Sequence, residues 1–349
     1  MRGLRGNGII AGHCGGSSAR WRRAGGVIAV LTLPMTTVGV AGAPAWAAGG
    51  HRAGGYRVTR TIPVGGSPYG VAVDSAAGTA YVTNYSSGTL SVIGVATNKV
   101  THTISIGRFP YGVAVDSAAR TVYVTNPFPE TVSVISVGTN KVTHAIPVAS
   151  PYGVAVDSAA GTAYVTNNAA GTVSVIGEAS DKVTHIIRVG GGPDGVAVDS
   201  AAHTAYVTSD NFSDIVSVID TGSNKVTHIT PVGAGPYGVA VDPTARTVYV
   251  ANYSSGTVSV IDGTTNKVTH TIPVGGSPNG VAVDPAARAV YVTNGAGTVS
   301  VIDEATDTVT ATVPVGAFPY GVAVDPATHA VYVANADSGT VSVIRKKCR

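Results

Sequence analysis

The sequence predicts an all-β fold, a seven-bladed β-propeller of four-stranded antiparallel blades, and the first of three supporting observations is a repeat. The segments Pro-Tyr-Gly-Val-Ala-Val-Asp, Tyr-Val-Thr-Asn, Gly-Thr-Val-Ser-Val-Ile and Asn-Lys-Val-Thr-His recur in this order, with small variations. A period near 42 residues built from short strands is typical of a propeller blade. The anchor glycines, 41 to 43 residues apart, are Gly70, Gly112, Gly153, Gly195, Gly238, Gly280 and Gly321.

Four strand signals in each repeat are the second observation. Gly-Val-Ala-Val is a short apolar run that suits an innermost strand buried on both faces. The Tyr-containing segment and Val-Ser-Val-Ile predict the second and third strands, and residues 99–104 alternate polar with apolar residues, as an exposed outermost strand does. After the innermost strand we expect a turn in which a carboxylate accepts backbone N–H groups. The carboxylates are those of Asp74, Asp116, Asp157, Asp199, Asp242, Asp284 and Asp325.

The ends of the repeat array are the third observation. Residues 56–64 match the fourth strand of the repeat, whereas the last repeat stops after its third strand, at Ile344. We therefore expect the N-terminal segment to supply the missing outer strand of blade seven. This arrangement would close the ring and leave only short, polar outer edges.

Residues 1–47 have the pattern of a secretory signal peptide. Arginines at 20, 22 and 23 precede an apolar stretch at 27–40, and Ala45-Trp46-Ala47 offers an Ala-x-Ala cleavage site. The stretch is shorter than the roughly 20 residues of a membrane-spanning helix. We expect a secreted or cell-surface protein with no membrane span after cleavage. A Gly/Ala-rich linker at 48–55, the propeller at 56–344 and a basic tail at 345–349 would follow.

The charge balance argues against nucleic-acid binding. The chain has a formal charge of +3, but five arginines lie in the predicted signal peptide, and without them 17 basic residues face 19 acidic ones. A nearly neutral protein has no long-range field that would collect nucleic acid. Of the two cysteines, Cys14 would leave with the signal and only Cys348 would remain, which precludes an intrachain disulfide. We expect a monomer.

The repeat resembles a known family. The motif Tyr-Val-Thr-Asn at residues 81–84, 123–126, 164–167 and 291–294 resembles the YVTN β-propeller repeat, and Pro-x-Gly-Val-Ala-Val-Asp is similar to an NHL repeat. Blades five and seven have Ala at the third motif position, and blade four has Ser209 at the fourth. The resemblance covers residues 56–344. It implies a seven-bladed propeller that is exported or on the cell surface, and it carries over no catalytic residue.

The loops on one face hold the candidate binding residues. Chain direction places the loops between strands two and three, and those between strand four and the next strand one, on the same face, here called the upper face. All four Phe residues map to it, as do the residues that precede the anchor glycines. We predict a ligand-binding surface around the channel mouth; the alternative is that each Tyr packs between blades and each Phe shields a loop. The candidates are Tyr69, Arg108, Phe109, Tyr111, Phe128, Tyr152, Asp194, Asp210, Phe212, Tyr237, Asn279, Phe318 and Tyr320.

No metal site, cofactor or catalytic residue is predicted. The seven Asp residues could form a metal ring, but a repeated turn role explains them equally well. One histidine per blade recurs on the outermost strand of the first five blades, where the side chains are too far apart to share a metal. These are His102, His144, His185, His228 and His270.

Three hypotheses for function follow. The preferred one is an exported, non-catalytic binding scaffold that recognises a protein or glycan of the cell envelope through the upper-face loops. The second is a lactonase or lyase at the channel mouth, with Asp194, Asp210 and Asn279 near the reacting group. The third is a structural component of a surface layer or an adhesion protein.

Overall fold

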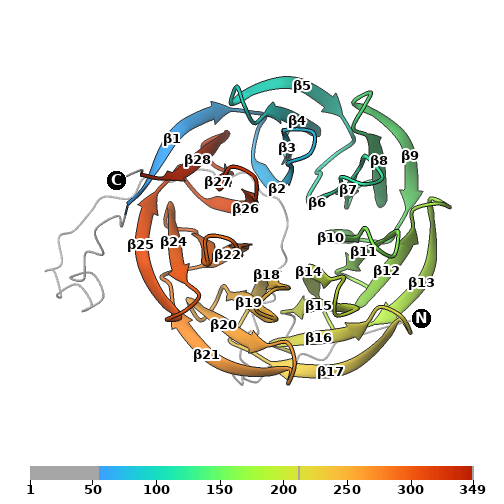
Figure 1. Ribbon diagram of the computed structural model, residues 1–349. Coiled ribbons are helices and arrows are strands. Elements are labelled where there is room, and N and C mark those ends of the chain that lie inside the picture. Colours follow the sequence, from blue (N-terminus) through green and yellow to red (C-terminus); the bar gives the residue numbers. More distant parts are fainter. Residues whose placement is uncertain (1–54, 211–212, 348–349) are drawn as a thin grey trace, which may run out of the picture. The chain divides into compact units, whose positions relative to one another are not determined.

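The protein is a ring of seven four-stranded antiparallel sheets (Figure 1). The computed structural model describes residues 55–210 and 213–347. Within these ranges every regular element is a strand, and no helix is long and apolar enough to cross a membrane. The predicted fold class, an all-β seven-bladed β-propeller, is confirmed.

From the innermost to the outermost strand, six of the blades follow chain order. Blades one to three comprise β2 (Pro68–Asp74), β3 (Thr79–Asn84), β4 (Thr89–Gly94) and β5 (Lys99–Ser105); β6 (Val113–Asp116), β7 (Thr121–Asn126), β8 (Thr131–Ser136) and β9 (Lys141–Pro147); and β10 (Pro151–Asp157), β11 (Thr162–Asn167), β12 (Thr172–Gly177) and β13 (Lys182–Arg188). Blades four to six comprise β14 (Pro193–Asp199), β15 (Thr204–Ser209), β16 (Ile215–Asp220) and β17 (Lys225–Pro231); β18 (Pro236–Asp242), β19 (Thr247–Asn252), β20 (Thr257–Asp262) and β21 (Lys267–Pro273); and β22 (Pro278–Asp284), β23 (Ala289–Asn294), β24 (Thr298–Asp303) and β25 (Thr308–Pro314).

Blade seven is built from both ends of the described chain. Its strands are β26 (Pro319–Asp325), β27 (Ala330–Asn335), β28 (Thr340–Lys346) and, outermost, β1 (Tyr56–Pro63). β1 pairs antiparallel with β28, and Figure 1 shows the blue β1 outside the red β28. The predicted closure by the N-terminal strand is therefore confirmed. β28 continues two residues beyond Ile344, because Arg345 and Lys346 pair with Arg57 and Tyr56.

The hydrophobic core lies between the middle strands of neighbouring blades. The tyrosine of the second strand is at most 2 % exposed in every blade, as at Tyr81 and Tyr206, and Val and Ile side chains of the third strands pack around it. The innermost strands differ from expectation, because β2 is only half-buried between its two ends. A strand that lines the central channel has one edge with no further sheet beside it.

The repeated Gly and Thr join neighbouring blades at five of the seven junctions. Gly70 N–H donates to Thr83 Oγ1 over 2.8 Å, and Thr83 Oγ1 donates to the Tyr111 carbonyl of blade two over 2.7 Å. A Cβ atom on Gly70 would stand 2.6 Å from that carbonyl oxygen, so only glycine fits. The same Thr bond recurs at Thr125, Thr166, Thr208 and Thr293, whereas Ala251 and Ala334 have no hydroxyl to make it.

The aspartate after each innermost strand has the predicted turn role. In all seven blades its Oδ1 accepts a backbone N–H two or three residues later, as Asp74 does from Ala77. At two junctions a serine of the next blade adds a bond, such as Ser117 Oγ to Asp74 Oδ1 over 2.9 Å. These turns lie on the face opposite the candidate residues, here called the lower face.

Candidate functional site

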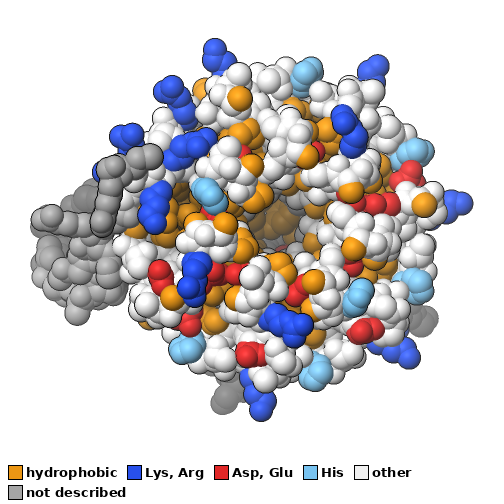
Figure 2. Space-filling model, viewed as in Figure 1, with side chains coloured by type: hydrophobic (Ala, Val, Ile, Leu, Met, Phe, Trp, Pro, Cys, Tyr) orange, Lys and Arg blue, Asp and Glu red, His pale blue; other side chains and the backbone are white. Residues whose placement is uncertain are grey.

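The residues before the anchor glycines converge around the mouth of the central channel. A cavity of about 180 Å³ opens there. Viewed as in Figure 1, the ring has a hollow at its centre, where the channel runs through it (Figure 2). Six of the seven residues line the cavity; at the seventh position only Gly153 and Val154, which follow Tyr152, do so. The six are Tyr69, Tyr111, Asp194, Tyr237, Asn279 and Tyr320.

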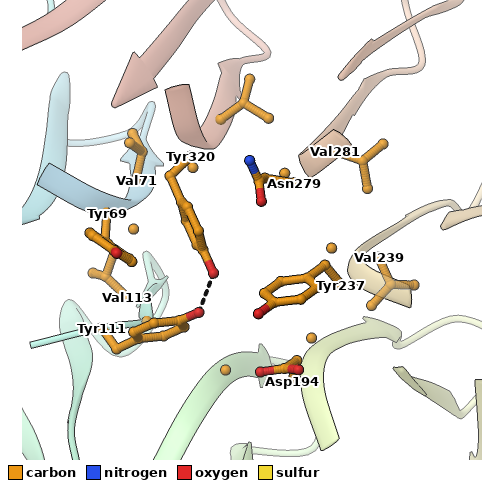
Figure 3. A pocket seen from close by; sticks show the side chains of 18 of the residues that line it. Tyr69, Val71, Tyr111, Val113, Asp194, Tyr237, Val239, Asn279, Val281 and Tyr320 are labelled. Atoms are coloured by element: carbon orange, nitrogen blue, oxygen red, sulfur yellow. Dashed lines mark hydrogen bonds between the residues drawn. The ribbon is translucent and has the colours of Figure 1, made fainter. Parts of the chain in front are cut away.

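Two tyrosine hydroxyl groups meet across the mouth. Tyr111 of blade two and Tyr320 of blade seven share a short hydrogen bond, and Figure 3 shows their hydroxyls directed toward the centre. Tyr69 belongs to blade one, which lies between them. The centroid of its ring is 4.4 Å from that of Tyr320 and 5.4 Å from that of Tyr111. Burial raises the pKa of both bonded tyrosines well above the usual range, and the Asp194 carboxylate adds to this rise. Both hydroxyls therefore keep their protons at neutral pH.

Asp194 and Asn279 are the two polar side chains at positions where the other blades have Tyr. Asp194 is 5 % exposed, and Asn168 Nδ2 donates to its Oδ1 over 3.3 Å. Asn279 Nδ2 donates to the carbonyls of Ser277 and Pro319 at 3.3 and 3.4 Å. Because both partners are acceptors, the amide nitrogen must face them, and the amide oxygen turns toward the mouth, as in Figure 3.

An aromatic stripe runs outward from the mouth across blades one and two. It comprises Tyr320, Tyr69, Tyr85, Phe109 and Phe128, with successive ring centroids 4.4, 5.0, 4.9 and 6.0 Å apart. Phe128 at its outer end is 62 % exposed. The Arg108 guanidinium lies 5.5 Å from the centre of the Phe109 ring. The stripe thus presents aromatic surface to solvent at one end and joins the cavity at the other.

The structure brings most, but not all, of the candidates together. Tyr152 packs on Tyr111 with ring centroids 4.7 Å apart, and Phe318 lies 6.4 Å from Tyr320. Asp210 does not line the mouth; it sits in the β15–β16 loop, where its N–H donates to the Gly192 carbonyl. Phe212 lies outside the described residues.

Three residues at the site were missed from the sequence. Tyr85 belongs to the stripe, and Asn168 donates a hydrogen bond to Asp194. The Tyr253 ring lies beside the Tyr237 ring at a tilt, with the two centroids 5.6 Å apart. Each immediately follows the fourth residue of the Tyr-Val-Thr-Asn segment. These residues lie in the loops between the second and third strands of their blades, and Phe128 lies in the corresponding loop of blade two. That shared loop was the signal in the sequence that could have identified them.

The histidines lie where they were predicted, on the outermost strands. His144 and His270 are mostly exposed, and each pairs at 3.0 Å with an aspartate of the next blade, Asp181 and Asp307. Within residues 55–210 and 213–347, no group of three or more His, Cys, Asp or Glu side chains is placed to hold a metal ion.

Two glutamates on the lower face form carboxyl pairs that the sequence did not reveal. Burial, then the neighbouring Asp116, raises the pKa of Glu178 to about 7, and burial with Asp242 does the same for Glu304. Each pair can share one proton as a hydrogen bond. Glu178 directly follows the third strand of its blade, and the residue at that place in blade two is Val137. Val137 therefore offers no carboxyl at the junction of blades one and two, where it lines a cavity of about 460 Å³.

The comparisons with known proteins support the fold. No protein-family model matches the sequence, and no curated protein matches it. Among solved structures, hydrazine synthase from Kuenenia stuttgartiensis matches with a TM-score of 0.73 and 21% sequence identity, over 80% of this chain and 95% of that one. The chain is a seven-bladed β-propeller, and its resemblance to the YVTN repeat stays a prediction.

Proposed function

We propose that this protein is an exported, non-catalytic binding module of the YVTN repeat type. It recognises a protein or glycan of the cell envelope through the upper face. The observation that carries this proposal is the aromatic stripe, which connects the channel mouth to the exposed Phe128.

The chemistry of the stripe suits recognition. Flat aromatic rings supply a large contact area with few rotatable bonds, and tyrosine hydroxyls add hydrogen bonds at its inner end. The rings rest on a closed frame in which a threonine hydroxyl bonds one blade to the next at five of the seven junctions. A rigid frame lowers the ordering cost of binding, because the contact surface is already formed. Packing within the frame does not require an exposed Phe128.

Capture from the cell-envelope fraction by the purified full-length protein tests the proposal. A Phe109→Ser, Phe128→Ser variant should capture the partner at least about tenfold less, since aromatic anchors carry much of the binding free energy. The matched control is Ile186→Ser, Ile229→Ser, which removes side chains that are 67% and 61% exposed on the outermost strands. This control should capture as well as the unmodified protein.

Treating the envelope fraction decides the class of partner. Loss of capture after protease digestion indicates a protein, and loss after periodate oxidation indicates a glycan. Equal capture by the Phe variant and the unmodified protein would overturn the proposal. The two other hypotheses would then be tested next. An assay of lactone hydrolysis tests the lactonase or lyase, and measurement of self-association of the purified protein tests the structural surface-layer or adhesion component.

A further inference from the structure

We propose that the lower-face cavity between blades one and two is a binding site for a small dicarboxylic acid. The cavity lies on the face opposite the aromatic stripe, and binding there does not depend on the proposed function. Two other blade junctions carry carboxyl groups of the protein itself at the equivalent positions, and they serve as internal templates for the ligand.

At the junction of blades five and six, the first template position holds a glutamate carboxyl. Glu304 directly follows the third strand of blade six, and its carboxyl meets Asp242 and Tyr249 of blade five. The guanidinium of Arg288, from the same blade as the glutamate, favours the ionised form of this carboxyl. One carboxyl group therefore has an aspartate, a tyrosine and an arginine as its neighbours.

The junction of blades one and two keeps these three neighbours and lacks the glutamate. Asp74 and Tyr81 of blade one and Arg120 of blade two occupy the same places in the repeat. Burial raises the pKa of Tyr81, and the Arg120 guanidinium acts against this rise, so its charge lies near the tyrosine hydroxyl. Val137 stands in place of the glutamate, and all four residues line the cavity of about 460 Å³.

A second carboxyl group is replaced at the same junction. At blades two and three, His144 pairs with Asp181 at 3.0 Å, and the equivalent pair recurs at blades five and six. At blades one and two the histidine is retained as His102, whereas Asn140 replaces the aspartate. Both residues line the cavity. A ligand with two carboxyl groups would fill both positions.

The charge of the cavity favours an acidic ligand. Arg120 is exposed and takes part in none of the ion pairs between the described residues. The Asp74 carboxylate already accepts the Ala77 N–H over 3.0 Å and the Ser117 hydroxyl over 2.9 Å. A guanidinium binds a carboxylate through parallel N–H donors. A ligand carboxylate would therefore give Arg120 the partner that a glutamate gives its equivalent in blade six.

Isothermal titration of the full-length protein tests the inference with three probes of equal chain length, glutarate, pentanoate and 1,5-pentanediol. The buffer contains no carboxylate and has pH 6, below the pKa of about 7 of Glu304, so that a bound carboxyl can share a proton with Asp74. Glutarate should bind at least about tenfold more tightly than either of the others, because only it fills both positions. Equal or tighter binding of another probe, or no binding of glutarate, would overturn the inference.

Replacing the arginine locates the first carboxyl group. Arg120→Gln should weaken glutarate binding by about tenfold or more, since it removes the charged donor. The matched control is Arg288→Gln, at the equivalent place of the junction that Glu304 already fills, and its affinity for glutarate should be unchanged. Equal affinity of the two variants would contradict the placement. Circular dichroism checks that each variant is folded.

Restoring the carboxyl groups of the templates should block the site from within. Val137→Glu should reduce glutarate binding by at least about tenfold, whereas Thr139→Glu, which adds the same charge at an exposed position outside the lining, should change it less than about threefold. Asn140→Asp fills the second position alone and should lower the affinity for glutarate to that for pentanoate. Full glutarate affinity in Val137→Glu or in Asn140→Asp would show that the ligand does not occupy the template positions.

Discussion

The two ends of the innermost strands differ in how strictly the repeat is kept. At the lower end the same aspartate closes the same turn in all seven blades. At the upper end, the residue before the anchor glycine is Tyr in five blades, Asp194 in blade four and Asn279 in blade six. The backbone there is still uniform, because the glycines and their carbonyl neighbours recur in every blade.

This difference separates the frame from the site. A turn aspartate is fixed by the backbone N–H groups that it must satisfy, so every blade needs it. The side chain before the glycine has no such backbone partner in common, and it can change from blade to blade without altering the ring. Changes at frame positions should therefore alter stability, whereas changes around the mouth should alter binding.

Deleting residues 56–63 should have the largest effect on the frame. The deletion removes β1, exposes the β28 edge and uncovers apolar side chains that Ile62 and its neighbours bury. We expect loss of most of the roughly 5–15 kcal/mol that stabilises a folded protein, or insolubility. Arg60→Ser, a change of an exposed side chain in the same strand, is the control and should melt like the unmodified protein. An unchanged melting temperature after the deletion would contradict the closure argument.

A single added methyl group on the frame should have an intermediate effect. In Gly70→Ala, the new Cβ would stand 2.6 Å from the Tyr111 carbonyl oxygen of the next blade. Overpacking of this kind costs about 1–3 kcal/mol, which urea denaturation would measure. Gly276→Ala is the matched control, because its added Cβ would meet no heavy atom within 4 Å and its φ is not in the left-handed region. Equal stability of the two variants would show that the blades can move apart at no cost.

Much of the frame could be predicted from the sequence because it repeats. Seven copies of a unit average out local ambiguity, and the fourth-strand pattern at residues 56–64 identified the closing strand. The upper-face position of Phe109, Phe128 and Phe318 followed from chain direction alone. Their ring contacts confirm that they gather on this face, in contact with Tyr85, with each other or with Tyr320.

Contacts between blades were harder to predict, since residues that are distant in sequence create them. Tyr85 reaches Phe109 of the next blade, and Asn168 reaches Asp194 of the next blade. Glu178 follows the third strand of blade three, yet its carboxyl meets Asp116 of blade two. The repeat unit describes one blade, and it does not specify which loop side chains of neighbouring blades are long enough to touch.

The smallest expected effect on stability comes from the carboxyl pairs on the lower face, which should make the free energy of unfolding fall as the pH rises. The pKa of Glu178 and of Glu304 is about 7 in the folded protein, above the ordinary value of 4.5. The folded state therefore binds more protons than the unfolded state between these values. Stability from the pairs is fully present below about pH 4.5 and is lost as the pH rises to about 7. The facing groups that also act on these glutamates are Tyr123 and Asp157 for the first, and Arg288 and Tyr249 for the second.

Glu178→Gln, Glu304→Gln should remove this pH dependence, since a glutamine side chain stays neutral like the protonated acid. Because both glutamates are partly exposed, we expect about 1 kcal/mol per pair between pH 4.5 and 7 after allowing for screening by solvent. The free energy of unfolding, measured in urea across this pH range, should fall in the unmodified protein and fall less in the variant. Glu130→Gln, an exposed residue of the upper-face β7–β8 loop, should retain the full dependence. Parallel curves for all three proteins would mean that the lower-face glutamates do not share protons with their aspartates. The pH dependence of stability would then come from other groups.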